Sequence, residues 1–284
     1  MRIGVIGGLN LDILGMPNAP LSLRDSNPGR VTLRAGGVGH NIGARLAAMG
    51  HRVTMLTALG SDAQADTLKV LCEKDAIDLS HALNTDKHTC TYLCLHDHTG
   101  DMYAAVNDMH AVDDMTPERI LPLLPALDGC KLCVMDTNPP AETLLACAKA
   151  LNMPVFVDPV SVFKGHKMLP MLPYVQAIKP NLMEARALTG EEDPEKAARR
   201  FLEMGAKQVF ISMGGDGVLY ADKDTLGVAP ALPLPAGTAL TGAGDSLCGG
   251  LIEGILQGLD TRETAYLGCK TAHDTLIELS RNMD

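Results

Sequence analysis

Short apolar segments alternate with helical patterns along most of this 284-residue chain. The apolar segments lack polar alternation, as expected of strands that are covered on both faces. The segments between them repeat apolar residues at the spacing of one helix face. This alternation predicts an α/β fold with a mainly parallel central sheet and helices on both faces. The expected strands are 3–6, 53–56, 132–135, 155–157, 177–179 and 209–212, and the expected helices are 38–49, 64–74, 117–124, 141–151, 181–188, 194–204, 243–257 and 262–279.

Two segments interrupt this alternation. Residues 9–35 are rich in Pro, Asn and Ser without helical periodicity, and residues 87–108 contain an alternating run, a turn and a second short strand. Both are typical of antiparallel excursions from an α/β body. We therefore expect residues 1–284 to form one domain, in which these two segments build a small β lid over the ligand face.

Charge and composition limit the partners that this chain can have. The net charge is −10 and the pI is near 5.3, whereas a general nucleic-acid binder would carry a basic stripe. No apolar run is long enough for a membrane span, and the first residues enter a strand without the pattern of a signal peptide. Eight scattered cysteines lie mostly in apolar runs, as in a reduced cytoplasmic protein. We expect a cytoplasmic protein without nucleic-acid or membrane partners.

The run Thr241-Gly242-Ala243-Gly244-Asp245 directly opens the helix expected at 243–257. Glycines allow N–H groups to approach a ligand closely, and a helix N-terminus is a ready site for an anion. Asp245 is either a first-turn charge that favours the helix dipole or a base beside a bound phosphate. Gly249, Gly250 and Gly254 within the helix each cost up to ~1 kcal/mol relative to Ala, so we expect them to permit close helix–sheet packing.

Four other stretches carry polar or glycine residues at the ends of expected strands or at the starts of helices, and each has two interpretations. Asn181 and Glu184 are spaced as a capping pair but also follow a strand on the ligand side of the sheet. Ser212–Gly217 is a hairpin turn or a nucleotide cradle. Gly36-Gly37-Val38-Gly39-His40-Asn41 is a tight turn into a helix or a close approach to a ligand, and His40 is expected to be a surface or capping residue. Asn10 and Asp12 are turn formers by default but also lie at the ligand edge.

Two further patterns favour structure over chemistry. Cys130 and Cys133 match a C-x-x-C spacing but run into a strand, so we interpret them as core residues. His96-Asp97-His98 has no second ligand pair at zinc spacing and is interpreted as a hairpin tip. The chain has no Gly-x-Gly-x-x-Gly or Walker A pattern, so neither dinucleotide nor P-loop chemistry is indicated.

Taken in order, these stretches resemble the ribokinase-like carbohydrate kinase family over nearly the whole chain. Within that family, four segments look most like pseudouridine kinases: Leu21–Arg30, Gly36–Asn41, Val106–Met109 and Asp158–Ser161. Two departures stand out. Ala239-Leu240 occupy the place of a common Asp-Thr pair that helps to hold a monovalent cation, which leaves potassium dependence open. His40 stands where pseudouridine kinases often have Arg.

The resemblance implies a role for each matching residue. Asp245 would be the catalytic base, and the N–H groups of Gly242, Ala243 and Gly244 would hold the transferring phosphoryl group. Asn181 would organise the ATP phosphates, and Glu184 would hold Mg²⁺ through water. The implied nucleotide-binding residues also include Ser212, Gly214, Gly215, Gly217 and Gly244, and the implied substrate-binding residues are Asn10, Asp12, Gly36, Gly37 and Asn41 for the ribose and Asn107 and Asp108 for the base.

The resemblance further implies an ATP-dependent, Mg²⁺-dependent kinase that pairs into a homodimer through its lid. We expect it to phosphorylate the 5′-hydroxyl of a ribonucleoside, with pseudouridine first. The alternatives are a kinase for free ribose, another sugar or another nucleoside, and, in a different class, a non-catalytic protein that senses a sugar or nucleoside.

Overall fold

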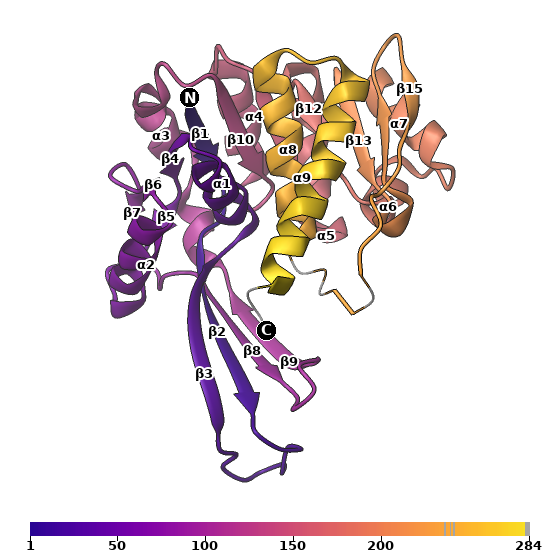
Figure 1. The fold of residues 1–284 in the computed structure, drawn as a ribbon. Coiled ribbons are helices and arrows are strands. Elements are labelled where there is room, and N and C mark those ends of the chain that lie inside the picture. Colours follow the sequence, from indigo (N-terminus) through magenta and orange to yellow (C-terminus); the bar gives the residue numbers. More distant parts are fainter. Residues whose placement is uncertain (236, 239, 241, 282–284) are drawn as a thin grey trace.

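A computed structural model describes residues 1–235, 237–238, 240 and 242–281. In this part of the chain nine strands form one sheet in the order β15-β14-β13-β12-β11-β10-β1-β4-β6 (Figure 1). All neighbours pair in parallel except β14, which is antiparallel to β13 and β15. The strands are β1 (Arg2–Ile6), β4 (Arg52–Leu56), β6 (Ile77–Asp78), β10 (Leu132–Asp136), β11 (Val155–Asp158), β12 (Ala177–Ile178), β13 (Gln208–Ser212), β14 (Val218–Ala221) and β15 (Leu226–Ala229).

Helices cover both faces of this sheet, as the alternation predicts. One face packs against α1 (Val38–Ala48), α2 (Ala63–Lys74), α8 (Ala243–Gln257) and α9 (Thr261–Arg281). The other packs against α3 (Pro117–Ile120), α4 (Ala141–Ala150), α6 (Leu182–Thr189), α7 (Pro194–Glu203) and a 3₁₀ segment, His166–Tyr174, that follows α5 (Val162–Gly165).

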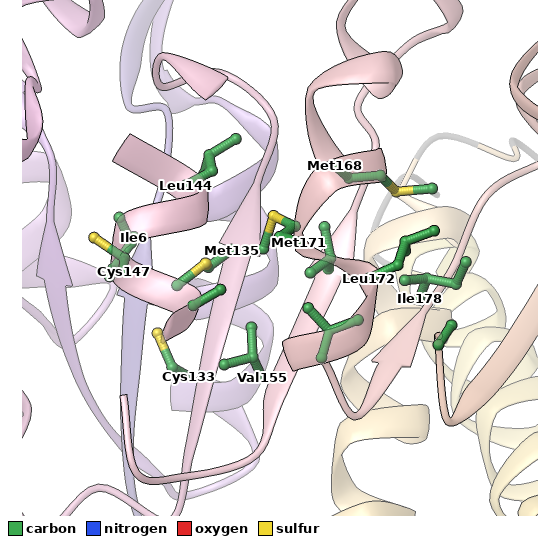
Figure 2. Close-up of a cluster of buried hydrophobic side chains, with 14 of the residues drawn as sticks. Ile6, Cys133, Met135, Leu144, Cys147, Val155, Met168, Met171, Leu172 and Ile178 are labelled. Carbon is green, nitrogen blue, oxygen red and sulfur yellow. The ribbon is translucent and has the colours of Figure 1, made fainter. Parts of the chain in front are cut away.

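Each face of the sheet has its own hydrophobic core, and successive side chains of the central strands point alternately into one core and the other. In β10, Val134 packs against the α1–α8 side, while Cys133 and Met135 pack against the α4 side. Figure 2 shows the core on the α4 side, where Met135 lies near Leu144 of α4 and Met171 of the 3₁₀ segment. These strands therefore contain apolar residues throughout because each face meets its own layer of helices.

Proline explains where the expected helices differ from the structure. The helix expected at 117–124 ends as an α-helix at Ile120 and continues as 3₁₀ turns over Leu121–Leu127. Pro122 and Pro125 lack the N–H that an α-helix requires at those positions. The segment 162–174 was not predicted as helical, and Pro170 and Pro173 within it break the periodicity on which such predictions depend.

The two interrupting segments form a separate four-stranded sheet in the order β3-β2-β8-β9, which projects from the body (Figure 1). Its strands are β2 (Asn10–Pro17), β3 (Gly29–Gly36), β8 (Thr91–His96) and β9 (Met102–Asp108). The β2–β3 and β8–β9 pairs are antiparallel hairpins, as expected, and a parallel β2–β8 pairing joins them. A further pair, β5 (Ala58–Leu59) with β7 (Leu83–Asn84), lies outside both sheets.

The glycines of α8 permit close packing, but against helices and not against the sheet as expected. A Cβ on Gly249 would lie 2.8 Å from Cγ of Arg45 in α1. A Cβ on Gly254 would lie 2.9 Å from Cα of Thr264 in α9. The expected partner was therefore wrong, while the expected close approach is present.

The interpretation of Cys130 and Cys133 as core residues is confirmed, since both are buried. Burial raises the pKa of the Cys133 thiol well above its usual range. His96-Asp97-His98 lies at the β8–β9 turn, as expected, where the Asp97 N–H donates to the Asp101 carbonyl at 2.8 Å. Among the residues with described positions, no helix is long and apolar enough to cross a membrane.

Candidate active site

Charged side chains gather at the carboxyl edge of the large sheet. Strands β10 and β11 end in Asp136 and Asp158, and Lys179 directly follows β12. The N-termini of α1 and α8 meet the same edge, where their peptide dipoles favour negative charge. This is the edge at which open α/β sheets bind their ligands.

The glycine loop before α8 has the geometry of an anion site. Gly242 adopts φ 84°, a left-handed conformation, and a Cβ at this position would meet nothing within 4 Å. Among the residues that the structure describes, no side chain caps the N-terminus of α8. The Ala243 N–H already donates to the Leu240 carbonyl at 3.2 Å, so Gly244 is the better candidate donor to a ligand. Thr241 and Ala239 lie outside the described residues.

Asp245 lies on the first turn of α8, and its carboxyl has a raised pKa. Burial raises the pKa of its carboxyl to about 6, and the nearby Asp158 carboxylate adds to the effect. Lys179 and a hydrogen bond from the Asn41 side chain act in the opposite direction. A carboxyl with a pKa near neutrality suits general base catalysis.

A buried ion pair beside Asp245 was not predicted from the sequence. Lys179 Nζ lies 3.1 Å from Asp158 Oδ2, and both side chains are about 9% exposed. Burial alone would lower the pKa of Lys179, but the Asp158 carboxylate outweighs it and holds the pKa well above its usual range. A Cβ on Gly244 would lie 3.9 Å from Lys179 Nζ, so this ammonium group lies directly behind the glycine loop.

Asn181 and Glu184 form the expected capping box at the start of α6. Asn181 Oδ1 accepts from the Glu184 N–H at 2.9 Å, and Glu184 Oε2 accepts from the Asn181 N–H at 2.8 Å. Burial raises the pKa of the Glu184 carboxyl. Asn181 also forms a parallel bridge with Ser212, which brings the capping box beside the loop after β13.

The interpretation of Ser212–Gly217 as a hairpin turn is confirmed, and its role as a nucleotide cradle stays a prediction. This segment is the turn of the β13–β14 hairpin, with a 3₁₀ turn at Gly214–Asp216, and it also lines a pocket of about 610 Å³. Cβ atoms on Gly214 or Gly215 would meet nothing within 4 Å, which leaves the backbone open to the pocket. The other wall is mainly apolar and includes Leu232, Leu240, Gly244, Leu247, Ala272, His273 and Leu276.

The glycines at the start of α1 approach other parts of the chain. A Cβ on Gly36 would lie 2.5 Å from the Asp12 carboxylate oxygens. Gly37 has a φ of 98°, and a Cβ on it would lie 2.5 Å from the Gly8 carbonyl oxygen. Asp136 fixes this arrangement, because its buried Oδ2 accepts from the N–H groups of Gly8 at 2.9 Å and Gly39 at 2.7 Å. Asp136 was not predicted as a site residue, although it is a carboxylate at the end of an apolar strand.

The lid sheet carries a row of polar side chains on one face. Strand register aligns Arg34, Asp12, Tyr92 and Asn107 across β3, β2, β8 and β9. The buried Asn10 side chain donates to Asp12 on the same strand. Burial raises the pKa of Asp12, while Asn10, His40 and Arg34 oppose the rise.

Asp108 does not join this row. Adjacent strand residues point to opposite faces, and the Asp108 carboxylate is bonded to His110 Nδ1 at 2.6 Å. The structure therefore separates Asn107 from Asp108, which the sequence analysis had treated as a pair. The expectation for His40 was also wrong, since its side chain is 3% exposed and Gly37 is the N-cap residue of α1.

This combination of fold and site is typical of a phosphotransferase: a pocket ends at a glycine loop that opens a helix, with the Asp245 carboxyl and a buried ammonium group behind it. The model for "pfkB family carbohydrate kinase" matches residues 2–276, and the chain belongs to this family. It transfers phosphate to a hydroxyl group of a carbohydrate or nucleoside.

Named relatives agree with this assignment. The chain is 34% identical to the pseudouridine kinase of Escherichia coli, over 94% of this chain and 88% of the relative. It is 27% identical to the cytidine kinase of Thermococcus kodakarensis, over 96% and 95% of the two chains. The crystal structure of a ribokinase from Thermotoga maritima matches with a TM-score of 0.83 and 26% identity, over 96% and 92%. The fold is thus ribokinase-like.

Proposed function

We propose that this kinase transfers the γ-phosphoryl group of ATP to the 5′-hydroxyl of a ribonucleoside, and that pseudouridine is the substrate. The observation that carries the reaction is Asp245, a half-buried carboxyl with a pKa of about 6 at the start of α8. The choice of pseudouridine rests on the 34% identity to a pseudouridine kinase over most of both chains.

Asp245 acts as the base. It accepts the proton of the substrate hydroxyl as the oxygen bonds to phosphorus and the bond to the ADP oxygen breaks. At neutral pH the carboxylate is mostly ionised yet still basic enough to draw the proton. Because phosphoryl transfer depends mainly on positioning and charge stabilisation, the Gly244 backbone and Lys179 hold the charge that gathers on the phosphoryl oxygens.

The pocket beside Gly244 fits the nucleoside part of ATP. Its volume of about 610 Å³ lies within the usual range for small-molecule sites. The apolar wall suits a purine ring, and the open Gly214–Gly215 backbone suits polar atoms that continue toward the glycine loop.

The residues near Lys179 also fit Mg²⁺. Glu184 keeps one carboxylate oxygen free of the capping box, and no cluster of three or more His, Cys, Asp or Glu that could hold a metal occurs among the residues described. This suits Mg²⁺, which is usually held by one or two carboxylates, water and substrate phosphates. A Mg²⁺ ion bound there would neutralise charge on the phosphates.

In this proposal the ribose binds between α1 and the lid. Asn41 lies near Asp245, and it follows Gly36, which packs closely against Asp12. Asp12 lies in the polar row and Asn10 donates to it from the same strand, so Asn10, Asp12 and Asn41 together offer acceptors and donors for ribose hydroxyls. Asn107, at the far end of that row, is the candidate contact to the base.

We further propose a homodimer that forms through the opposite face of the lid. Register places Leu33, Ile13, Leu93 and Val106 side by side there, with Val31 and Leu95 in the next row. Val31, Leu93 and Val106 are 71%, 50% and 68% exposed, respectively. A contiguous exposed apolar surface of this kind is typical of an interaction site, and a second copy of the same face is its natural complement.

A coupled ADP-release screen tests the substrate. Pseudouridine, uridine, cytidine, adenosine, ribose and fructose are compared at equal concentration, and ³¹P NMR identifies the position of the phosphate in the product. We expect pseudouridine to have the highest kcat/KM and the product to be a 5′-phosphate. A higher kcat/KM for a free sugar or another nucleoside would replace pseudouridine as the substrate. Failure of all compounds to stimulate ADP release would favour the non-catalytic alternative, which the relatives do not support.

A further inference from the structure

His273 on α9 lines the pocket beside Gly244, and the proposed reaction gives it no role. The residues of α9 that line this pocket are spaced along one face of the helix: Cys269, Ala272, His273 and Leu276. Of the described residues around the pocket, only Ser212 and His273 carry nitrogen or oxygen atoms in their side chains. The His273 side chain is 24% exposed. An imidazole in a mainly apolar wall is the kind of group that fixes the orientation of a ligand.

His273 does not belong to the turn of α9 nearest to the glycine loop. Helices α8 and α9 run in opposite directions, because a Cβ on Gly254 would touch Thr264, whereas a Cβ on Gly250 would touch Thr271. Residues later in α9 therefore lie nearer to the start of α8, and the turn that follows His273 is closer to the glycine loop. In the proposed reaction this loop holds the phosphate that is transferred. The base, at the other end of the nucleotide, is then the part of ATP that reaches His273.

Asp274 determines which nitrogen of the His273 ring carries a hydrogen. Nδ1 lies 3.0 Å from Asp274 Oδ1, and the Lys270 ammonium group donates to Asp274 Oδ2 at 2.6 Å. Hydrogen bonds from Lys270 and His273 lower the pKa of the Asp274 carboxyl, so this group is ionised at neutral pH and only accepts hydrogen bonds. Nδ1 is therefore the donor, and in the neutral ring Nε2 carries the lone pair and accepts.

The accepting nitrogen faces the pocket. Asp274 lies outside the part of the pocket wall that the structure describes, so the Nδ1 edge of the ring points away from the pocket and the Nε2 edge toward it. Within the described ranges of the chain, Nδ1 forms the one hydrogen bond of this ring and Nε2 forms none. An acceptor in an apolar wall costs free energy until a ligand supplies a donor.

We propose that His273 is a specificity-determining residue that selects adenine over guanine nucleotides, because its Nε2 accepts a hydrogen bond from the amino group of adenine. The inference rests on the proposed function, in which this pocket binds the nucleoside part of ATP. Adenine has its N6 amino group, a donor, where guanine has its O6 carbonyl, an acceptor. Guanine thus sets an acceptor against Nε2 and leaves both atoms unpaired. A site that binds through such a hydrogen bond rejects the analogue that lacks the donor.

Calorimetric titration with non-hydrolysable imido analogues of ATP and GTP tests the proposal without turnover. The titrations are run at pH 8, above the ordinary pKa of histidine. The unsubstituted protein is expected to bind the ATP analogue at least about tenfold more tightly than the GTP analogue. His273→Ala is expected to bind the ATP analogue about three- to tenfold more weakly, the equivalent of one hydrogen bond, and to bind the GTP analogue no more weakly, so that the two affinities converge.

Three further variants separate the accepting nitrogen from the rest of the ring. Lys270→Ala is the matched control: it removes the other hydrogen bond of Asp274 and leaves the contact of Nδ1 with Oδ1, so the preference for the ATP analogue is expected to stay unchanged. Asp274→Ala keeps the histidine but lets either nitrogen carry the hydrogen, and is expected to reduce the preference. His273→Gln presents an amide that can donate or accept, and is expected to bind both analogues with similar affinity.

NMR of protein labelled with ¹⁵N in its histidine rings provides a second readout. The Nε2 signal of His273 is assigned by its absence in His273→Ala. It is expected to shift when the ATP analogue is added, because Nε2 gains a hydrogen bond, and to show no shift of that kind with the GTP analogue.

An affinity ratio that is the same in the unsubstituted protein and in His273→Ala would overturn the proposal, as would tighter binding of the GTP analogue by the unsubstituted protein. Both results leave the proposed kinase reaction intact, since the ADP-release screen decides that reaction separately. If the protein binds neither analogue, the nucleotide site of the proposed function is wrong and the inference fails with it. Failure of the inference alone and failure of the proposed function are thus distinguished.

Discussion

Replacement of the candidate base by its neutral isostere, Asp245→Asn, is expected to stabilise the folded protein while it abolishes turnover. Burial and Asp158 raise the pKa of Asp245 from its ordinary value of 3.8 to about 6. Each pKa unit corresponds to about 1.4 kcal/mol, so ionisation of Asp245 costs the folded state roughly 3 kcal/mol. Asn carries no charge and avoids this cost, as expected where function and stability conflict.

The sign of the pH dependence follows from the direction of the shift. The folded protein binds the Asp245 proton more tightly than the unfolded chain does, so this group lowers the free energy of unfolding as pH rises. The decrease occurs between pH 4 and pH 6, the interval between the two pKa values, and is complete above it. Asp245→Asn is therefore expected to be more stable than the unsubstituted protein by up to roughly 3 kcal/mol at pH 8, with little difference at pH 4.

Urea unfolding of both proteins between pH 4 and pH 8 measures this difference. Asp62→Asn is the control with the opposite sign. Burial would raise the pKa of Asp62, but hydrogen bonds from Thr89 and the Ala65 N–H outweigh it and lower the pKa, so its ionised form stabilises the fold. That variant should lose stability at pH 8. The reasoning is refuted if Asp245→Asn is no more stable at pH 8, or if its advantage persists unchanged at pH 4.

Four further results are expected. Turnover should fall as pH drops through about 6, because protonated Asp245 cannot accept the hydroxyl proton; initial rates between pH 5 and pH 8 measure this acid limb. Lys179→Met should lower the free energy of unfolding by roughly 3–5 kcal/mol in urea, because it leaves Asp158 buried and unpaired. Glu184→Gln should raise the Mg²⁺ concentration for half-maximal turnover by about tenfold or more, as a Mg²⁺ titration would show. Leu93→Lys should convert the proposed dimer to a monomer in sedimentation velocity, since it places a charge in the exposed apolar face of the lid.

The body of the fold was predictable because its strands are covered on both faces. An apolar segment such as 132–135 has one strong interpretation when helical segments flank it, and the structure confirms it as β10. The lid strands were harder to predict, because one face is polar and the other is exposed. Sequence predicted the two hairpins, but the parallel β2–β8 pairing that joins them depends on residues far apart in the chain.

Residues of the site were predictable where a local pattern carries the chemistry. Asn181 and Glu184 have the spacing of a capping box, and Gly242–Asp245 opens a helix. The pair Asp158–Lys179 was missed because its spacing is set by the sheet. The signal was nevertheless available: each residue terminates an apolar strand, and adjacent parallel strands bring such ends together.

Asp108 shows the opposite failure, in which neighbours in the sequence were taken as neighbours in the site. The alternation of side chains along a strand separates Asp108 from Asn107. Strand period alone could therefore have chosen between them, once Asp12 and Tyr92 had fixed which face of the lid is polar.

The glycines of α8 show that the free-energy cost of Gly in a helix indicates close packing, even when the element that packs there is wrongly predicted. Gly249 and Gly254 in a helix interior are unfavourable by up to about 1 kcal/mol each, so a stable helix that contains them must gain from contacts that a Cβ would prevent. The structure places those contacts on α1 and α9. Close approach to α1 is also what brings Asn41 to Asp245, one turn before Gly249. Gly249, which weakens the helix, is thus the residue that lets α1 bring Asn41 close to the candidate base.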